Sequence, residues 1–371
     1  MVKAVASELQ VEREQVMAYR VAALGLATRG SQRPGELSVL DLGVQEYTPG
    51  SARVALAART EADLADPRLI TVWAARGAPH LHRRTDLAAL MTALWPVSDA
   101  DAAARITSGQ IPQGGRLGVA AFTATAAAFR AVVQESMPRG EVSRQVSARV
   151  PPELTYECRS CQARHIAGNV WQHSGLAGGI EVEARGRDAT LGPITDLPGP
   201  PTENAGIDRL IGTYLRLLGP ATPVEVAKYL GSSTAEIKKV WPADLAEVTV
   251  GNRRSWLPAA AVGELKAAEP APGVRLLPPM DALIQARDRD LVVPDKKQQK
   301  QVWRTLGNPG VLLLDGEIAG VWRAKMVGRK RVELAVTGFG SLSAKQRKAV
   351  EGEAAVVARA REVGDVGVAY E

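Results

Sequence analysis

The stretch that decides the fold is residues 222–258, "TPVEVAKYLGSSTAEIKKVWPADLAEVTVGNRRSWLP". Thr222 and Glu225 have the spacing of a capping box, and Pro223 suits the first helical position between them. The same spacing returns at Ser233 and Glu236, after a glycine-containing turn of about four residues. Two short capped helices joined in this way predict a helix-turn-helix.

The flanking residues extend this unit to a winged helix. Upstream, "IDRLIGTYLRLLG" (207–219) has apolar residues at helical spacing and stops at a Gly-Pro pair. Downstream, "AEVTVGNRRSWLP" (246–258) predicts a hairpin. A winged helix used only for packing is the alternative, because a fold does not fix a function. The cations of this unit suit DNA phosphates better than base edges; they are Lys238 and Lys239 on the predicted groove helix and Arg253 and Arg254 on the wing.

The same order of elements recurs twice upstream, with little similarity between the letters. In the middle of the chain the expected helices are "AAFTATAAAFRAVVQESM" (120–137), "RGEVSRQVSARV" (139–150) and "RSCQARHIAGNVWQHSG" (159–175), and the hairpin "GIEVEARGRDATLGP" (179–193) turns at Gly186. At the N-terminus they are "LQVEREQVMAYRVAALGL" (9–26), "GELSVLDLGVQ" (35–45) and "SARVALAARTEA" (51–62), followed by the hairpin "LITVWAARGAPHLHRR" (69–84). We therefore predict an α+β protein, mainly α, of three tandem winged-helix domains at 1–115, 116–200 and 201–371.

The third domain continues into a β-rich extension. "GVLLLDGEIAGVWRAKMVGRKRVELAV" (310–336) predicts three strands with tight turns between them, and residues 341–364 predict a capped surface helix of mixed charge. The second turn gathers Lys325, Arg329, Lys330 and Arg331, the densest positive cluster in the sequence. Such cations repel one another unless an anion comes near, which favours contact with a nucleic-acid backbone over a merely solvated tip.

Bulk properties narrow the class of protein. A net charge of +6 and a pI near 9.4 over 371 residues are compatible with an anionic partner without requiring one. Two cysteines do not make a disulfide framework, so a reducing, cytoplasmic location is expected. The first 30 residues lack an apolar signal core, and no apolar run is long enough to span a membrane.

Five pieces of the chain, in order, resemble one known family. They are "LGVQEYTPGSARVALAAR" (42–59), "VWAARGAPHLHRR" (72–84), "ECRSCQARHI" (157–166), "VRLLPPMDALIQARDRDLVVPD" (274–295) and "GVLLLDGEIAGVWR" (310–323). Together they resemble the winged-helix DNA glycosylases of the AlkZ and YcaQ type. The resemblance implies a C-shaped clamp around double-stranded DNA, for which one copy of the chain suffices. It also implies hydrolysis of the N-glycosidic bond of alkylated bases, interstrand crosslinks among them.

The family's catalytic signature is a glutamine, an apolar residue, and a glutamine or aspartate. Carried across, it falls on Gln45, Glu46 and Tyr47, where the middle residue is charged and the last is a phenol. Gln45 can hold a water, and Glu46 can support an oxocarbenium-like sugar if the end of a helix turns it inward. A phenol with a pKa near 10 is a poor base. In the alternative interpretation Gln45 caps the helix and Glu46 is a solvated charge.

Several other polar residues are candidates for DNA or metal binding. We expect Arg53, Arg76, His80 and His82 to contact DNA, although the two histidines also fit a packed polar strand. Cys158 and Cys161 with His165 and His173 lack the ligand spacing of a zinc finger, so no metal is predicted. No phosphate-binding loop is present, so neither a nucleotide nor any other cofactor is expected. In "MDALIQARDRDLVVPD" (280–295), alternating acids and arginines predict a salt-bridged loop.

Two functions remain open from the sequence. The first is a DNA glycosylase that repairs alkylation damage without a metal or a nucleotide. The second is a non-catalytic DNA-binding protein, a regulator or a damage sensor, which Tyr47 favours because the family's amide or carboxylate is missing there.

Overall fold

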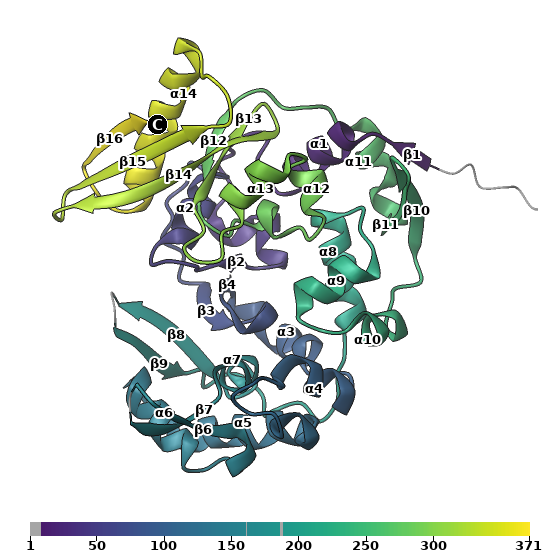
Figure 1. The fold of residues 1–371 in the computed structure, drawn as a ribbon, viewed down its shortest axis with the longest axis vertical. Coiled ribbons are helices and arrows are strands. Elements are labelled where there is room, and N and C mark those ends of the chain that lie inside the picture. Colours follow the sequence, from purple (N-terminus) through teal and green to yellow (C-terminus); the bar gives the residue numbers. More distant parts are fainter. Residues whose placement is uncertain (1–8, 161, 186–187) are drawn as a thin grey trace, which may run out of the picture.

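The protein is an α+β chain in two lobes (Figure 1), in a computed structural model that describes all residues except 1–8, 161 and 186–187. The lower lobe holds the middle of the chain, and the upper lobe holds the N-terminal and C-terminal thirds together. Within the described residues, no helix is long and apolar enough to cross a membrane.

The unit predicted for residues 207–258 forms as expected. It consists of α8 (Ile207–Leu218), α9 (Pro223–Leu230), α10 (Thr234–Lys239) and the hairpin of β10 (Leu245–Val250) and β11 (Arg253–Pro258). The capping box at Thr222 is confirmed, because the Thr222 N–H donates to the Glu225 carboxylate at 2.7 Å. At Ser233 only the first half is confirmed: Ser233 Oγ accepts from the Glu236 N–H, but the Glu236 carboxylate binds Ser98 and Lys239 and does not reach back. The sequence did not predict the short strand β1 (Leu9–Val11), which pairs in parallel with β10.

The middle unit differs from expectation at two places. Its α5 (Val119–Val132), α6 (Arg139–Ser147), and hairpin of β8 (Ile180–Arg185) and β9 (Asp188–Pro193) follow the predicted order. The helix expected over 120–137 ends at Val132, and the short strand β5 (Met137–Pro138), which pairs with β9, was not predicted. The single helix expected over 159–175 is wrong: its first half is the strand β7 (Ala163–Ile166), paired with β6 (Thr155–Cys158), and only α7 (Gly168–Ser174) is helical. The helical spacing of apolar residues is confined to Ile166–Ser174, so the residues before it were free to pair as strands. Gly186 lies outside the described residues.

The N-terminal unit places the candidate catalytic residues differently from the prediction. Its elements are α1 (Arg13–Ala23), α2 (Ser51–Ala57), β3 (Leu69–Trp73) and β4 (Pro79–Arg83). The helix expected over 35–45 is replaced by 3₁₀ turns at Pro34–Glu36 and Ser38–Asp41 and by the strand β2 (Val44–Gln45), which pairs with β4.

Gly43 is the reason that the helix stops before Gln45. It has φ +78°, and a Cβ at this position would lie 2.2 Å from the His82 ring. Only glycine fits both the left-handed backbone and the close approach of the imidazole. The chain therefore turns at Gly43 and enters the sheet at Val44.

The C-terminal extension is a five-stranded sheet covered by one long helix. Its strands, in sheet order, are β12 (Val274–Leu277), β13 (Gly310–Leu314), β14 (Glu317–Val327), β15 (Arg331–Gly338) and β16 (Asp365–Tyr370). The covering helix α14 (Ala344–Ala360) begins at a capping box on Ser343, as predicted, and buries Val350, Ala354 and Val357 against the sheet. Between β12 and β13 lie the short helices α12 (Arg289–Val292) and α13 (Lys296–Val302).

Besides the core between the C-terminal sheet and α14, two buried cores divide the molecule in a way that follows space rather than sequence. One core joins the N-terminal unit to the 207–258 unit through side chains such as Tyr19, Leu56 and Leu215. The other joins the middle unit to β3, α3 (Leu87–Leu94) and α4 (Asp99–Ile106). The sheet of β2, β4 and β3 lies between the lobes, and the hairpins β8–β9 and β14–β15 project on one side of it (Figure 1).

Candidate functional site

Gln45 lies on β2 and is almost fully buried. Its side chain is 8% exposed, and its Oε1 accepts a hydrogen bond from Arg76 Nη2 at 3.4 Å. Glu46 follows the last residue of β2, and its carboxylate is bound to the start of α2, so it does not face a sugar together with Gln45. The interpretation of Gln45 as the cap of a helix is also wrong, since it pairs with His80 inside a sheet.

Arg76 holds Gln45 in place from the turn between β3 and β4. The arginine has φ +59°, a strained value for a residue with a side chain. Its Nη1 donates to the Tyr229 carbonyl at 2.6 Å, its Nη2 donates to Gln285 Oε1 at 2.7 Å, and its guanidinium lies 4.9 Å from the centre of the Tyr229 ring. Burial, helped by the charge of Arg287, lowers the pKa of Arg76 to about 10. All its hydrogen-bond partners in the described part of the chain are neutral, so its charge is not cancelled at the site.

Glu46 stabilises the start of α2. Its carboxylate accepts hydrogen bonds from the backbone N–H groups of Gly50 and, at 2.7 Å, Ala52. Burial raises the pKa of this carboxyl, and those two N–H groups oppose the rise. Both expectations for Glu46 are therefore wrong: it is not a solvated charge, and its carboxylate points into the end of a helix rather than toward Gln45.

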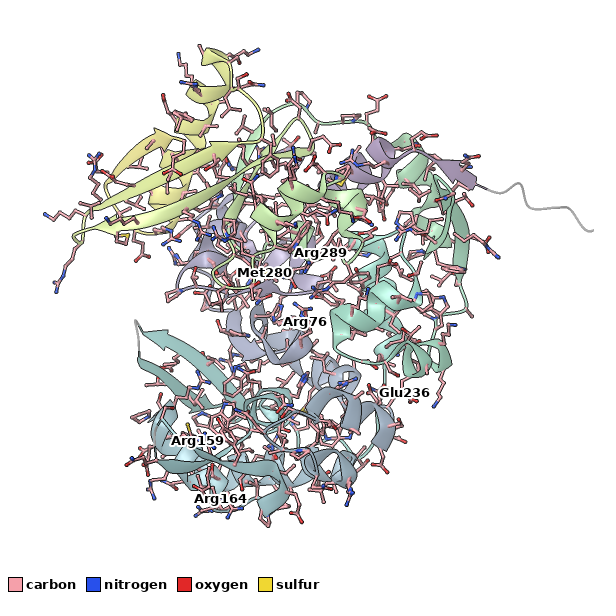
Figure 2. All side chains as sticks on the ribbon, viewed as in Figure 1. Arg76, Arg159, Arg164, Glu236, Met280 and Arg289 are labelled. Carbon is pink, nitrogen blue, oxygen red and sulfur yellow. The ribbon has the colours of Figure 1, made fainter. Side chains whose placement is uncertain are left out.

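Tyr47 begins a chain of polar contacts that returns to Gln45. The Tyr47 hydroxyl accepts from the backbone N–H of Asn308 at 3.2 Å and from Asn308 Nδ2 at 3.4 Å. Asn308 Nδ2 also lies 3.6 Å from the sulfur of Met280, and Gln285 Nε2 donates to the Met280 carbonyl at 2.9 Å. Gln285 in turn accepts from Arg76. Met280 and Arg76 lie near the middle of the molecule, where the two lobes meet (Figure 2).

Three residues of this site were missed from the sequence: Met280, Gln285 and Asn308. Met280, like Arg76, has a positive φ, +59°. Such strain in a residue that is not glycine tends to mark functional sites. Met280 and Gln285 lie inside one of the pieces that carry the family resemblance, which was the only available signal.

The two histidines of β4 are part of the interior. His80 and His82 are 0% and 2% exposed, and burial lowers their pKa values to about 3 and about 4 respectively. Both imidazoles are neutral at neutral pH and closed to solvent. The expectation that they face DNA is wrong, and the packed polar strand is correct.

Apart from Arg76, the cations predicted to meet DNA fall into two groups. Five form ion pairs with acids that offset their positive charge. The pairs are Arg53 with Glu362, Lys239 with Glu236, Arg253 with Glu225 and Asp288, Arg254 with Glu247, and Arg331 with Asp365. Lys238, Lys325, Arg329 and Lys330 are exposed, and none has an acidic partner among the described residues. Within the positive cluster predicted at the hairpin tip, Arg331 is thus neutralised by an acid, and Lys325, Arg329 and Lys330 have no acidic partner among the described residues.

No metal centre emerges from the described residues. Outside the masked positions, no group of three or more histidine, cysteine, aspartate or glutamate side chains is close enough to hold an ion. Cys158 ends a strand rather than beginning a helix. Cys161 lies outside the described residues.

Comparison with known proteins gives consistent similarities. The family model described as "DNA glycosylase AlkZ-like" matches residues 39–360. An interstrand DNA cross-link repair glycosylase of Streptomyces sahachiroi is 34% identical over 177 residues, which are 45% of this chain and 46% of that protein. The matched part therefore spans under half of that relative's length. The solved structure of Streptomyces sahachiroi DNA glycosylase AlkZ superimposes with a TM-score of 0.72 at 24% identity, over 98% of this chain and 100% of that one.

Proposed function

Because the chain belongs to the AlkZ-like family of DNA glycosylases, we propose that it hydrolyses the N-glycosidic bond of alkylated bases in duplex DNA, interstrand crosslinks among them. The observation that carries the proposal is the fixed carbonyl of Gln45. Arg76 uses one of the two acceptor positions of this oxygen, which leaves the other for a water. No side chain in the described part of the chain accepts a hydrogen bond from the Gln45 amide nitrogen, so that group can also contact the water or the sugar.

The chemistry needs little from the protein beyond position and electrostatics. Alkylation at a purine ring nitrogen makes the base cationic, so it departs with the electron pair of the glycosidic bond and becomes neutral. The water oxygen bonds to the sugar carbon, and its proton passes to solvent. A carbonyl dipole aimed at the developing oxocarbenium ion stabilises it, as preorganised dipoles do in other enzymes. Glu46 is committed to α2 and takes no part.

Tyr47 lies in the bend directly after β2, two residues from Gln45, and the chain of polar contacts through Asn308 links the two side chains. Its oxygen accepts both hydrogen bonds from Asn308, which leaves its own proton to donate. The phenol therefore orients the water or the sugar and does not act as a base.

We further propose that the domains 1–115, 116–200 and 201–371 are three tandem winged helices that clamp one duplex as a single copy. Each contains a run of helices followed by a two-stranded hairpin. The hairpins β8–β9 and β14–β15, on opposite lobes, project on the same side of the sheet that carries Gln45 (Figure 1). Lys325, Arg329 and Lys330 at the tip of β14–β15 supply charge for phosphates.

Incubation with duplex DNA that contains N7-alkylguanine, followed by detection of abasic sites, tests the activity. Gln45→Ala should lower the rate of base release about 100-fold or more, the usual loss for an oriented polar group in a transition state. Gln134→Ala, an exposed glutamine of the lower lobe, is the matched control and should leave the rate unchanged. Wild-type protein that binds this DNA without releasing base would instead support the second candidate, a damage sensor, to which the Tyr47 substitution points.

A further inference from the structure

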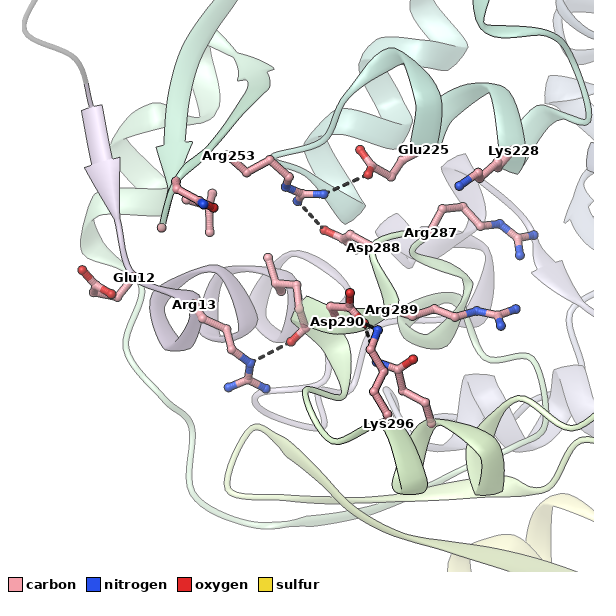
Figure 3. Close-up of a pocket in the computed structure, with 15 residues that line it drawn as sticks. Glu12, Arg13, Glu225, Lys228, Arg253, Arg287, Asp288, Arg289, Asp290 and Lys296 are labelled. Carbon is pink, nitrogen blue, oxygen red and sulfur yellow. Dashed lines mark hydrogen bonds and ion pairs between the residues drawn. The ribbon is translucent and has the colours of Figure 1, made fainter.

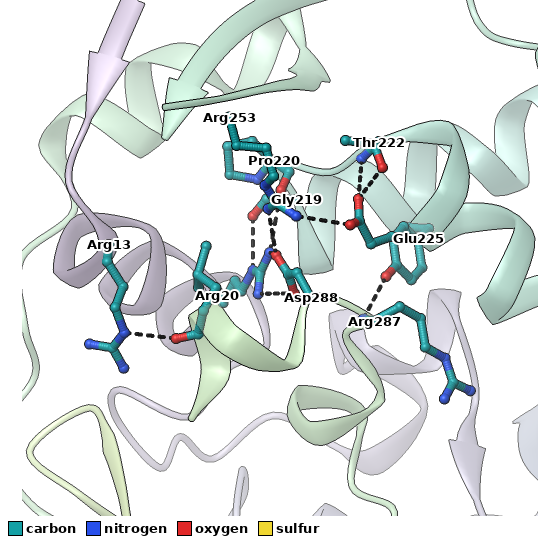
Figure 4. A network of polar contacts seen from close by, with 11 residues as sticks. Arg13, Arg20, Gly219, Pro220, Thr222, Glu225, Arg253, Arg287 and Asp288 are labelled. Carbon is teal, nitrogen blue, oxygen red and sulfur yellow. Dashed lines mark hydrogen bonds and ion pairs between the residues drawn. The ribbon is translucent and has the colours of Figure 1, made fainter. Parts of the chain in front are cut away.

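The alternating segment at residues 287–290 separates its charges by sign. Asp288 is held by Arg20 at 2.7 Å and by Arg253 at 3.0 Å, and Asp290 pairs with Lys296 (Figures 3 and 4). Arg287 and Arg289 form no ion pair with any described residue. The prediction of a salt-bridged loop is therefore right for Asp288 and Asp290 and wrong for the two arginines, while Asp295 caps α13 instead of forming an ion pair.

These two arginines line one pocket with Lys228. The pocket measures about 990 Å³, and its other walls include Arg13 and Arg253. In Figure 3, Arg287 and Arg289 extend in the same direction from adjacent turns of the chain, and Lys228 lies beside Arg287. The other cations of the pocket are engaged: Arg13 with Glu317, Arg253 with Glu225 and Asp288, and Lys296 with Asp290. Lys228, Arg287 and Arg289 are thus the cations of this wall that no described acid neutralises, and the acid Glu12 lines the far side of the pocket (Figure 3).

No described acid neutralises either guanidinium group. The backbone N–H of Arg287 donates to the Tyr214 hydroxyl at 3.3 Å, while its buried Nε has no hydrogen-bond partner. Arg289 lies over the Trp303 ring, 4.9 Å from its centre. Burial, with a smaller contribution from Arg289, lowers the pKa of Arg287. A half-buried cation with an unsatisfied donor is costly, and an anion beside it offsets that cost.

The pocket wall adjoins the site around Gln45. Gln285, which binds Arg76, is two residues before Arg287 in the chain. Tyr229, whose ring lies under Arg76, directly follows Lys228. The charge of Arg287 also reaches Arg76, where it helps to lower the pKa. A DNA strand that ran past Gln45 would therefore meet these cations next.

We propose that Lys228, Arg287 and Arg289 form a phosphate row that grips the DNA backbone beside the base presented to Gln45. The inference rests on the proposed function, because it takes duplex DNA as the ligand. Phosphate contacts fix the register of a protein on DNA without reading the sequence. The row thus sets which nucleotide lies opposite Gln45, and its three members are positioning residues rather than catalytic ones.

Salt-dependent binding to an undamaged duplex tests the row apart from catalysis. Log affinity falls as log salt concentration rises, and each lost phosphate contact makes this slope shallower by about 0.9. The double variant Arg287→Gln with Arg289→Gln should therefore reduce the magnitude of the slope by about 2, and Lys228→Gln alone should reduce it by about 1. Arg287→Lys with Arg289→Lys keeps the charge and should keep the slope. The matched control is Arg13→Gln, in the same pocket but paired with Glu317, which should also leave the slope unchanged.

The outcomes separate the two proposals. If wild-type protein binds duplex DNA and the neutralised variants show the same salt slope, the phosphate row is refuted and the proposed glycosylase function still stands. Wild-type protein that does not bind the duplex would overturn both. A thermal unfolding curve for each variant shows whether it is folded, and Lys228, which is exposed, gives a test that does not depend on burial.

Discussion

Asp281 is the residue whose loss should most disturb the site without touching it. Its carboxylate forms two hydrogen bonds to the Arg59 guanidinium, at 2.9 and 3.0 Å, and the side chains of the pair are 0% and 1% exposed. Asp281 also accepts from the Leu283 N–H at 3.1 Å, which starts the turn that leads to Gln285. The pair therefore ties α2 to the segment that carries both Met280 and Gln285.

Asp281→Asn should leave a buried charge without its partner. The asparagine keeps one acceptor but turns an amide donor toward the guanidinium of Arg59, and breaking a buried pair in this way costs about 3–5 kcal/mol. With a urea slope near 3 kcal/mol per M, the unfolding midpoint should fall by about 1 to 2 M. Base release should fall as well, because Gln285 no longer holds Arg76 in place.

Asp290→Asn is the matched control on the same segment. Its pair with Lys296 is open to solvent, with side chains 72% and 70% exposed, so its loss should cost about 1 kcal/mol or less. Urea titration of wild type and both variants, followed by circular dichroism, gives the comparison. If Asp281→Asn lowered the midpoint no more than Asp290→Asn does, the buried pair would not hold the segment and the reasoning would fail.

Three further predictions concern the residues around Gln45 and the hairpin tip. Glu46→Ala should cost about 0.5–2 kcal/mol, the value of a lost helix cap, with base release still measurable; a rate loss as large as that of Gln45→Ala would contradict the structural role. Because burial raises the folded-state pKa of Glu46, the stability that this carboxyl adds is present below its unfolded value and is lost as pH rises through the folded one; Glu46→Gln should therefore gain stability relative to wild type as pH rises above the ordinary carboxyl pKa of 4.5, and urea midpoints that stay parallel would refute this. Lys330→Gln should lower the salt slope of DNA binding by about 0.9, and Arg331→Gln by less, since Asp365 already neutralises it; equal losses would show that the ion pair opens on DNA.

Much of the local structure was predictable from neighbouring letters. The capping boxes at Thr222 and Ser343 are complete within four residues, and they mark the starts of α9 and α14 correctly. The hairpins around residues 251 and 316 were predictable from turn residues that lie between two runs of strand-forming residues. These features depend on contacts only a few residues apart, which a single sequence displays directly. The family resemblance, in turn, led to Gln45 through the spacing of its signature.

Only the tertiary structure decided how those pieces become a site. Gln45 is on a strand because β4, some 35 residues later, supplies its hydrogen bonds, and Glu46 turns away because the backbone N–H groups of Gly50 and Ala52 donate to its carboxylate. The contact of Arg76 with Gln285 spans 209 residues, and that of Tyr47 with Asn308 spans 261. Neighbours in space also determine which arginine is left without an acidic partner. Asp288 pairs with Arg20 and Arg253, and Arg287 pairs with no described acid. Hydrogen bonds and ion pairs act over a few ångströms of space, and a sequence records distance along the chain instead.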